Sequence, residues 1–248
     1  MKKLEINFEN YWDCLDDKFD ELIKNGYVKF PSIADLDLNQ IFKRISSQIS
    51  YKKGGFVGSD SAYTELNDEH KIFIGKLLLD KYLAPKLFDF AQREFGYKGL
   101  ISNQYHVART AKPGDQKYGG HFDSHIFTLI IPIRIPEVNT INEPIGEFIY
   151  FPNMRVFPKN EFIDFVGKLW TKQYSSESGM KKLAKKKKMN INSFTDYEPL
   201  LFLGNTVFHA NMPISTNSDS HRLTLLAHYF DPFPKYGLGS LLRTIRFR

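Results

Sequence analysis

The stretch GGHFDSH at residues 119–125 constrains this chain more than any other. In an extended segment, successive side chains point to opposite faces, so His121 and Asp123 would project to the same face. An imidazole and a carboxylate held together in this way can bind a metal ion, provided that a third ligand joins them. His209, on an apolar and strand-like run, can supply that ligand. The sequence therefore predicts a fold that brings two distant extended segments together.

A cation and a hydroxyl follow His209 and extend the pattern. Arg222 comes thirteen residues after His209, and Thr224 shares its face if this segment is a strand. A guanidinium group with a hydroxyl beside it can bind a carboxylate through a fork of donors and one further hydrogen bond. Two histidines and one carboxylate are also the ligand set of non-haem Fe(II) oxygenases, which leaves one face of the metal open for co-substrate and dioxygen.

This order of residues resembles the Fe(II)- and 2-oxoglutarate-dependent dioxygenase superfamily. The resemblance covers residues 100–230, and NGYVKFPSIADLDLNQIFKRI at residues 25–45 looks like the entry segment of the phytanoyl-CoA dioxygenase-like branch. It implies that iron is bound by the catalytic residues His121, Asp123 and His209. It further implies that Arg222 and Thr224 bind the distal carboxylate of 2-oxoglutarate, and that dioxygen is the third reactant.

The resemblance also implies a reaction. Asp123 supplies a carboxylate where the halogenases of the family have a small residue, so we expect hydroxylation of a small substrate, with release of succinate and CO2, rather than halogenation. The motif alone leaves desaturation, cyclisation and epoxidation open.

Further polar residues are candidates for the same site. Gln104 and Tyr105, with His106 beside them, lie on a predicted strand that borders the metal in the family, so they are candidates for binding the co-substrate. Their alternative role is that of hydrogen-bonded polar groups in the core. Arg134 and Arg155 are candidates for binding an anionic substrate.

Apolar periodicity predicts a mainly β fold with N-terminal helices, of the α+β class. The resemblance makes it a double-stranded β-helix, also called a jelly roll or cupin-like fold. We expect a single dioxygenase domain over residues 1–248: a helical N-terminal buttress at 1–98, a double-stranded β-helix at 99–230 with a helical insertion at 157–198, and a tail at 231–248. The predicted helices are 11–24, 35–49, 70–95 (broken at Pro85) and 161–174, and the predicted strands are 27–30, 100–108, 126–135, 146–151, 199–209 and one ending near Phe230. The glycine-rich stretch 51–67 is predicted to be a loop.

The insertion has two distinctive features. Residues 161–174 place their apolar side chains on one helical stripe, which we expect to cover an apolar surface near the mouth of the barrel. Residues 181–188 contain six lysines. These lysines form either a solvated face or a surface that attracts a small, acidic substrate.

Composition narrows the setting. Cys14 is the only cysteine, so no intramolecular disulfide and no cysteine-based zinc site can form, which favours a reducing, cytoplasmic compartment. The longest apolar runs are strand-sized, so no membrane partner is expected. The net charge of +6 permits anionic ligands. Nucleic acid is not the expected partner, and the oligomeric state is left open.

Two other functions fit parts of the pattern. The first is a cupin-like metalloenzyme that does not use 2-oxoglutarate and has His125 among its ligands. The second is a non-catalytic module that binds nucleic acid or another anion through the lysine run.

Overall fold

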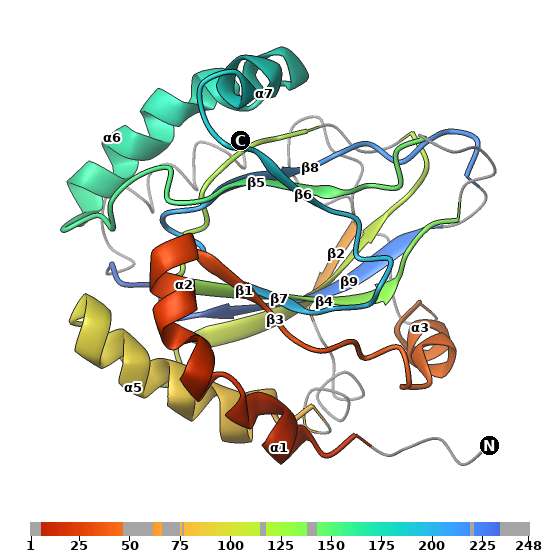
Figure 1. The fold of residues 1–248 in the computed structure, drawn as a ribbon, viewed down its shortest axis with the longest axis horizontal. Coiled ribbons are helices and arrows are strands. Elements are labelled where there is room, and N and C mark those ends of the chain that lie inside the picture. Colours follow the sequence, from red (N-terminus) through yellow and green to blue (C-terminus); the bar gives the residue numbers. More distant parts are fainter. Residues whose placement is uncertain are drawn as a thin grey trace.

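Two antiparallel sheets that face each other form the body of the molecule (Figure 1). The major sheet has the strand order β1-β7-β4-β9-β3-β2, and the minor sheet has the order β6-β5-β8. Helices cover the outer sides of both sheets. A computed structural model describes residues 6–46, 62–65, 75, 77–114, 118–137, 143–218 and 221–233. His70, most of the predicted loop at 51–67 and the tail beyond Phe233 lie outside these ranges.

Two of the predicted helices are divided differently in the structure. The predicted helix at 11–24 is three short helices, and it ends as expected at Gly26, whose φ of 78° is left-handed. Near the predicted break at Pro85, the π-helix η2 gives way to α5, and Pro85 lies in the first turn of α5, where a residue needs no amide hydrogen. The helical elements are α1 Phe8–Asp13, the 3₁₀ helix η1 Asp16–Lys18, α2 Phe19–Asn25, α3 Leu38–Ser46, the π-helix η2 Leu79–Leu83, α5 Ala84–Phe95, α6 Glu161–Thr171, the 3₁₀ helix η3 Lys172–Tyr174 and α7 Glu177–Ala184.

The strands correct two predictions. The single strand predicted at 199–209 is two strands in different sheets, because a turn at residues 204–206 carries the chain from the major to the minor sheet. The predicted loop at 51–67 contains β2, which pairs with β3 at the edge of the major sheet. The strands are β1 Tyr27–Lys29, β2 Ala62–Glu65, β3 Gln104–Ala111, β4 Phe127–Arg134, β5 Phe148–Phe151, β6 Asn190–Asn192, β7 Leu200–Leu203, β8 Phe208–Asn211 and β9 Arg222–Tyr229.

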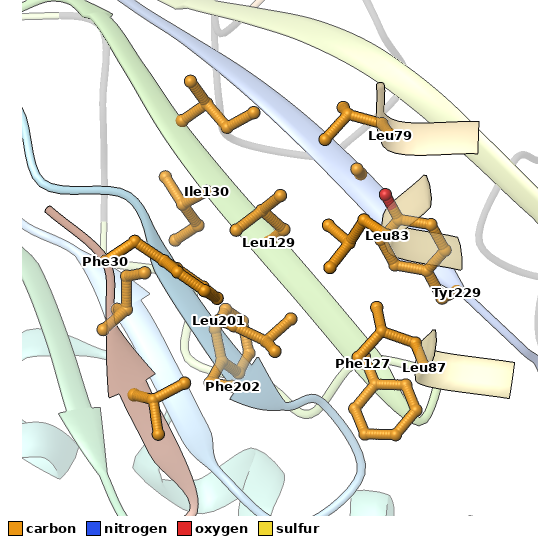
Figure 2. Close-up of a cluster of buried hydrophobic side chains, with 14 of the residues drawn as sticks. Phe30, Leu79, Leu83, Leu87, Phe127, Leu129, Ile130, Leu201, Phe202 and Tyr229 are labelled. Atoms are coloured by element: carbon orange, nitrogen blue, oxygen red, sulfur yellow. The ribbon is translucent and has the colours of Figure 1, made fainter. Parts of the chain in front are cut away.

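The main hydrophobic core joins the N-terminal helices to the major sheet. Leu79, Leu83 and Leu87 from η2 and α5 point toward Phe127 and Tyr229 on the strands (Figure 2). All five side chains are fully buried. Burial of this kind contributes about 1.5–3 kcal/mol for each large side chain, so this layer carries much of the stability of the fold.

The two helices of the insertion lie over the minor sheet and beside it (Figure 1). Met180 and Leu183 of α7 pack on the outer face of that sheet, against Ile149 and Phe208. Neither α7 nor β6 was predicted from the sequence. No helix among the described residues has the length and apolar character needed to cross a membrane.

The helix α6 has the opposite orientation to the predicted one. Of the predicted stripe, Phe162, Val166, Leu169 and Trp170 are between 45% and 62% exposed, as is the neighbouring Ile163, whereas Phe165 is half-buried. Its buried residues are Asp164 and Thr171. Periodicity identifies which residues share a face of a helix but does not say which face points inward. The expectation that the apolar stripe covers the body is therefore wrong.

Candidate metal centre

His121, Asp123 and His209 come together at one end of β8. His121 and His209 exchange two backbone hydrogen bonds of 3.0 Å. These bonds add residues 119–125, which we call the metal-binding segment, to the edge of the minor sheet. Asp123 Oδ1 lies 3.4 Å from His121 Nε2 and 3.6 Å from His209 Nε2. One candidate ligand atom from each residue lies within 4.8 Å of the others. Within the described ranges, no other three His, Cys, Asp or Glu residues meet in this way.

Backbone carbonyl groups fix the orientation of both imidazole rings. His121 Nδ1 lies 2.9 Å from Gly119 O, and His209 Nδ1 lies 3.1 Å from Val207 O. Each Nδ1–H can therefore donate to a carbonyl oxygen, which leaves the lone pair of Nε2 directed toward Asp123. Neighbouring ligands of a metal with bonds of about 2.1 Å are about 3 Å apart. A small contraction of the observed distances would suit a metal bound to these three groups.

Asp123 is held by groups on two strands. Thr128 Oγ1 donates a 2.5 Å hydrogen bond to Asp123 Oδ2, and Oδ1 is left facing the histidines. Thr128 Oγ1 also lies 3.1 Å from His228 Nδ1. A threonine hydroxyl has one hydrogen, so His228 must be the donor in the second bond. Thr128 and His228 are paired residues of β4 and β9, which places both on the face that looks into the barrel.

Burial sets the protonation states of the site. It lowers the pKa of His209 to about 4 and also lowers the pKa of His228. Burial would raise the pKa of Asp123, but His209, the hydrogen bond with His121 and the nearby His228 hold this pKa well below its usual value. At neutral pH the site therefore offers a neutral His209 and an ionised Asp123, which are the forms that bind a divalent cation.

Gly204 lets the turn between β7 and β8 approach the metal-binding segment. Its backbone oxygen accepts a 3.0 Å hydrogen bond from the amide of Asp123. A Cβ atom at position 204 would lie 2.6 Å from His125 O and 2.8 Å from Asp123 Cβ. Any larger residue would displace Asp123, so glycine is needed here for close packing.

Arg222 and Thr224 lie on the same inward face of β9 as His228. Both are almost fully buried, with exposed fractions of 2% and 4%. The Arg222 guanidinium donates to the carbonyl oxygen of Gly146, which precedes β5, so its side chain reaches from the major sheet toward the minor sheet. The structure thus places a buried cation and a hydroxyl within the barrel, on the strand that also carries the support for Asp123.

Strand β3 adds two residues to this inward face. Tyr105 pairs with His228 and stacks on its ring, with the centroids 4.7 Å apart. Arg109 pairs with Thr224, and its charge helps to lower the pKa of His209. Arg109 was not singled out in the sequence. The alternation that marks Tyr105 also places Arg109 on the same face, and this signal could have identified it.

Three other candidate residues lie away from the triad. Gln104 pairs with Tyr229 on the helix-covered face of the major sheet, and His106, on the same face, has its Nε2 3.3 Å from Asp80 of η2. Both therefore point away from the inward face that carries His228. Arg134 lies at a β-bulge at the far end of β4 from Thr128. His125 packs its ring against Tyr105 and His228 instead of joining the triad.

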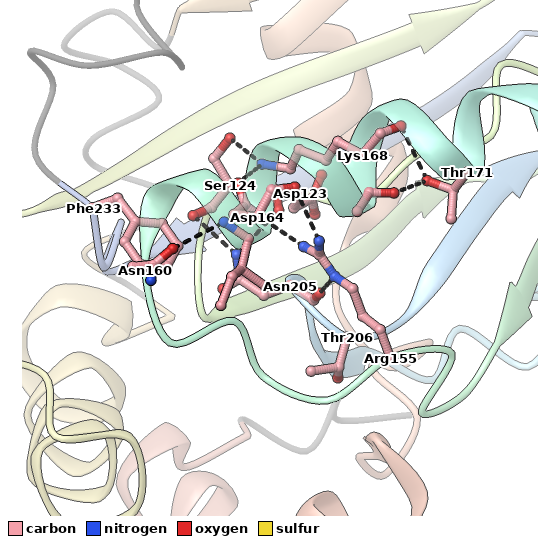
Figure 3. A network of polar contacts seen from close by, with 12 residues as sticks. Asp123, Ser124, Arg155, Asn160, Asp164, Lys168, Thr171, Asn205, Thr206 and Phe233 are labelled. Atoms are coloured by element: carbon pink, nitrogen blue, oxygen red, sulfur yellow. Dashed lines mark hydrogen bonds and ion pairs between the residues drawn. The ribbon is translucent and has the colours of Figure 1, made fainter.

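Arg155 belongs to a polar network beneath the metal-binding segment (Figure 3). Its Nε donates a 2.6 Å hydrogen bond to Asn205 O, and its other nitrogen atoms donate to Asp164 of α6. Lys168 Nζ lies 2.7 Å from Asp164 Oδ2 and donates a 3.1 Å hydrogen bond to Ser124 Oγ. The network connects α6 to Ser124, the neighbour of Asp123. Arg155 is thus placed to position the segment rather than to contact a substrate.

Comparison with known proteins identifies the architecture. The sequence matches no protein-family model and no curated protein. Among solved structures, the carbocyclase SnoK from nogalamycin biosynthesis is 12% identical with a TM-score of 0.53, over 98% of this chain and 93% of that one. The fold is a double-stranded β-helix. The predicted jelly roll is confirmed.

Two further structures share this fold. The epimerase SnoN, in complex with Fe3+, alpha ketoglutarate and nogalamycin RO, is 14% identical with a TM-score of 0.51, over 92% of this chain and 89% of that one. A prolyl 4-hydroxylase from Phytophthora capsici is 12% identical with a TM-score of 0.54, over 97% of this chain and 74% of that one. At these identities the likeness establishes the fold, so the function must be argued from the site.

Proposed function

We propose that this protein is an Fe(II)- and 2-oxoglutarate-dependent oxygenase. The observation that carries the proposal is the triad of His121, Asp123 and His209, with both Nε2 atoms and one carboxylate oxygen directed at a common point. Two imidazoles and one carboxylate fit Fe(II) and leave coordination positions for other ligands. SnoN and SnoK, an epimerase and a carbocyclase that depend on alpha ketoglutarate, have the same fold and support the same assignment.

The roles of the chain's residues follow from their positions. His121, Asp123 and His209 would hold the metal, while Thr128 and His228 keep the Asp123 carboxylate oriented. Iron, 2-oxoglutarate and dioxygen would together supply the oxidising power to attack a substrate C–H bond, with succinate and CO2 released. The protein contributes binding, orientation and the exclusion of water.

Arg222 and Thr224 would bind the distal carboxylate of 2-oxoglutarate. A guanidinium buried between two sheets attracts an anion more strongly than an exposed one does, because little water screens it. Arg109, from the same inward face, and Tyr105, stacked on His228, are further candidates for contact with the co-substrate.

For the reaction outcome and the substrate, the proposal names only a class. The structures with this fold include a hydroxylase, an epimerase and a carbocyclase, so the fold serves several outcomes. Hydroxylation of a small molecule is the outcome that we propose, since Asp123 occupies the ligand position that a halide would need. An acidic substrate stays a prediction based on the charge of the chain.

The metal is tested first by binding. Replacing His121, Asp123 or His209 with Ala should abolish Fe(II) or Co(II) binding in equilibrium dialysis, with an unchanged circular dichroism spectrum. His125→Ala is the matched control and should keep most of the affinity. Loss of the metal in His125→Ala, with retention in Asp123→Ala, would favour the cupin-like alternative.

The co-substrate is tested by calorimetry on the metal-loaded protein. Arg222→Ala should weaken 2-oxoglutarate binding by about 2–4 kcal/mol, because it removes a charge-assisted contact. Arg222→Lys keeps the charge and is the control for a folding defect caused by loss of the buried cation. Thr224→Val should weaken 2-oxoglutarate binding less than Arg222→Ala does. Equal 2-oxoglutarate affinity in the parent and Arg222→Ala would contradict the proposed role of Arg222. A screen for substrate-stimulated succinate release across amino acids, sugars, nucleotides and acyl thioesters then addresses the substrate.

A further inference from the structure

The outer surface of the insertion combines an apolar stripe with a dense group of lysines. The apolar stripe consists of Phe162, Ile163, Val166, Leu169 and Trp170 on α6, and its two largest side chains, Phe162 and Trp170, are 62% and 60% exposed. The lysine group consists of Lys172, Lys181, Lys182, Lys185, Lys186, Lys187 and Lys188, all of which are exposed. Scattered apolar residues are normal on a surface, but a contiguous stripe of five marks an interaction site.

The stripe and the lysine group both point away from the body of the molecule. In α6 the buried Asp164 and Thr171 point to the body, so the stripe points outward. In α7 the buried Met180 and Leu183 pack on the minor sheet, so Lys181 and Lys182 on the other side of that helix point outward, and the exposed lysines at 185–188 follow the helix. The two helices follow one another along the same side of the molecule (Figure 1). The stripe and the lysine group therefore both lie on the outer side of the insertion.

Contacts on the inward face of α6 hold the helix with its apolar stripe outward. Asp164 lies 2.5 Å from Arg155, which is outside the helix, and Lys168 donates a 3.1 Å hydrogen bond to Ser124 Oγ. Turning the helix to bury its stripe would break both contacts and separate the buried charges of Arg155 and Asp164, which is costly. The helix is thus locked with its apolar residues outward.

We propose that this surface docks the protein on the face of a lipid bilayer that contains anionic lipids. A short helix with Trp, Phe and Leu on one side and lysines around it is the composition that lies in the membrane interface. The lysines add electrostatic attraction to anionic headgroups, about tenfold or less in affinity for each one. No membrane partner was expected from the sequence, because its longest apolar runs are strand-sized, but a helix that lies in the interface needs no such run.

Charge decides against the other occupants. A second copy of this chain would bring one lysine group near another, and the whole chain carries a net charge of +6. A nucleic acid would satisfy the lysines, but its phosphate backbone would leave the apolar stripe in water. An anionic bilayer satisfies both parts of the surface at once.

Vesicle flotation tests the proposal directly and does not depend on catalysis. The parent chain should float with phosphatidylcholine vesicles that contain about one-third phosphatidylserine, and much less with pure phosphatidylcholine. Changing Lys185, Lys186 and Lys187 to Gln should weaken binding to the anionic vesicles by roughly 100-fold. The matched control changes three exposed lysines outside the insertion, Lys24, Lys81 and Lys98, to Gln and should bind like the parent.

The contribution of the apolar stripe is tested with a double variant on the stripe and a control double variant elsewhere. Leu169→Gln with Trp170→Gln should weaken binding about tenfold or more, since these side chains would no longer enter the interface. Leu100→Gln with Ile101→Gln changes two exposed apolar residues elsewhere and should have no effect.

Tryptophan fluorescence reports insertion of the stripe itself. The chain has two tryptophans, and Trp12 is only 1% exposed, so Trp170 is the one that can respond to lipid. Its emission should shift to shorter wavelength when anionic vesicles are added. A Trp170→Phe variant should bind the vesicles but show no shift.

Three results would overturn the proposal. The first is that the parent fails to float with anionic vesicles. The second is that the parent floats equally well with neutral and anionic vesicles, and that the lysine variant floats as well as the parent. It could also form a dimer through the stripe, seen by sedimentation and lost in the Leu169 and Trp170 variant, which would identify a second copy of the chain as the occupant.

Discussion

Two helices of similar length, α5 and α6, cover opposite sides of the body and do so in opposite ways. The helix α5 buries Ala84, Leu87, Phe90 and Ala91 against the major sheet. The helix α6 buries Asp164 and Thr171 and exposes its apolar residues. Apolar burial is non-directional and mainly stabilises the fold. A few directional ion contacts instead fix where one element lies relative to another, so we expect α5 to govern stability and α6 to govern the position of the metal-binding segment.

The largest expected effect is on stability from the α5 side. Leu87→Ala removes a fully buried side chain and should lower the free energy of unfolding by about 2–5 kcal/mol. Leu169→Ala, on the exposed stripe of α6, should change it by less than about 0.5 kcal/mol. Urea denaturation measures both. Similar losses in the two variants would show that the stripe is buried in solution and would remove the contrast.

Acid should act mainly through the metal centre. The pKa of His209 is about 4 in the folded protein, below its usual 6.5, so the unfolded chain binds more protons between these values. The metal-free protein should therefore lose up to about 3 kcal/mol as the pH falls from about 6.5 toward 4. The lowered pKa of Asp123 has the same sign, since its folded form resists protonation.

Two variants separate the contribution of the metal centre to acid sensitivity from that of the helix-covered face of the major sheet. His209→Gln should flatten the acid-induced loss of stability, which chemical denaturation at each pH can follow. Burial also lowers the pKa of His106 on the helix-covered face, although Asp80 opposes the shift. His106→Gln should therefore flatten the loss less than His209→Gln does. The reverse order would place the acid sensitivity on the helix side.

The smallest expected effect tests the positioning role of α6. Asp164→Asn weakens the contact of α6 with Arg155 and the pairing that orients Lys168 toward Ser124, so the segment around Ser124 should be held less firmly. Changes to groups that orient metal ligands typically cost 10–100-fold in metal affinity, and we expect about tenfold here. Co(II) titration followed by its absorption spectrum measures this, with Lys172→Gln on the same insertion as the control. A loss of stability with unchanged Co(II) affinity would make the network merely structural.

Two members of the triad could be predicted together because their pattern is local, whereas His209 was added from a distant apolar run. His121 and Asp123 are two residues apart, and alternation in an extended segment is enough to place them together. The bend at Gly204 was missed, because the apolar run on both sides of it looks like one strand. The orientation of α6 was also missed, since it depends on an ion network between Arg155 and Asp164 that no periodicity encodes.

The residues of β3 were predicted only in part. Tyr105 was named as a candidate, and strand pairing places it beside His228. The same alternation would have excluded Gln104 and included Arg109, but only if the strand's inward face had been known. That face is set by pairing with β9, a contact between residues far apart in the chain.

The bridge between His121 and His209 has a consequence for how the protein would respond to its metal. Two amide hydrogens, one from each histidine, close this bridge, and each belongs to a residue whose side chain is a candidate ligand. A bound ion would connect the same two residues a second time, through their side chains, so opening the bridge would require releasing the ion as well. The hydrogen–deuterium exchange rates of these two amides should therefore report metal occupancy, before any substrate is known.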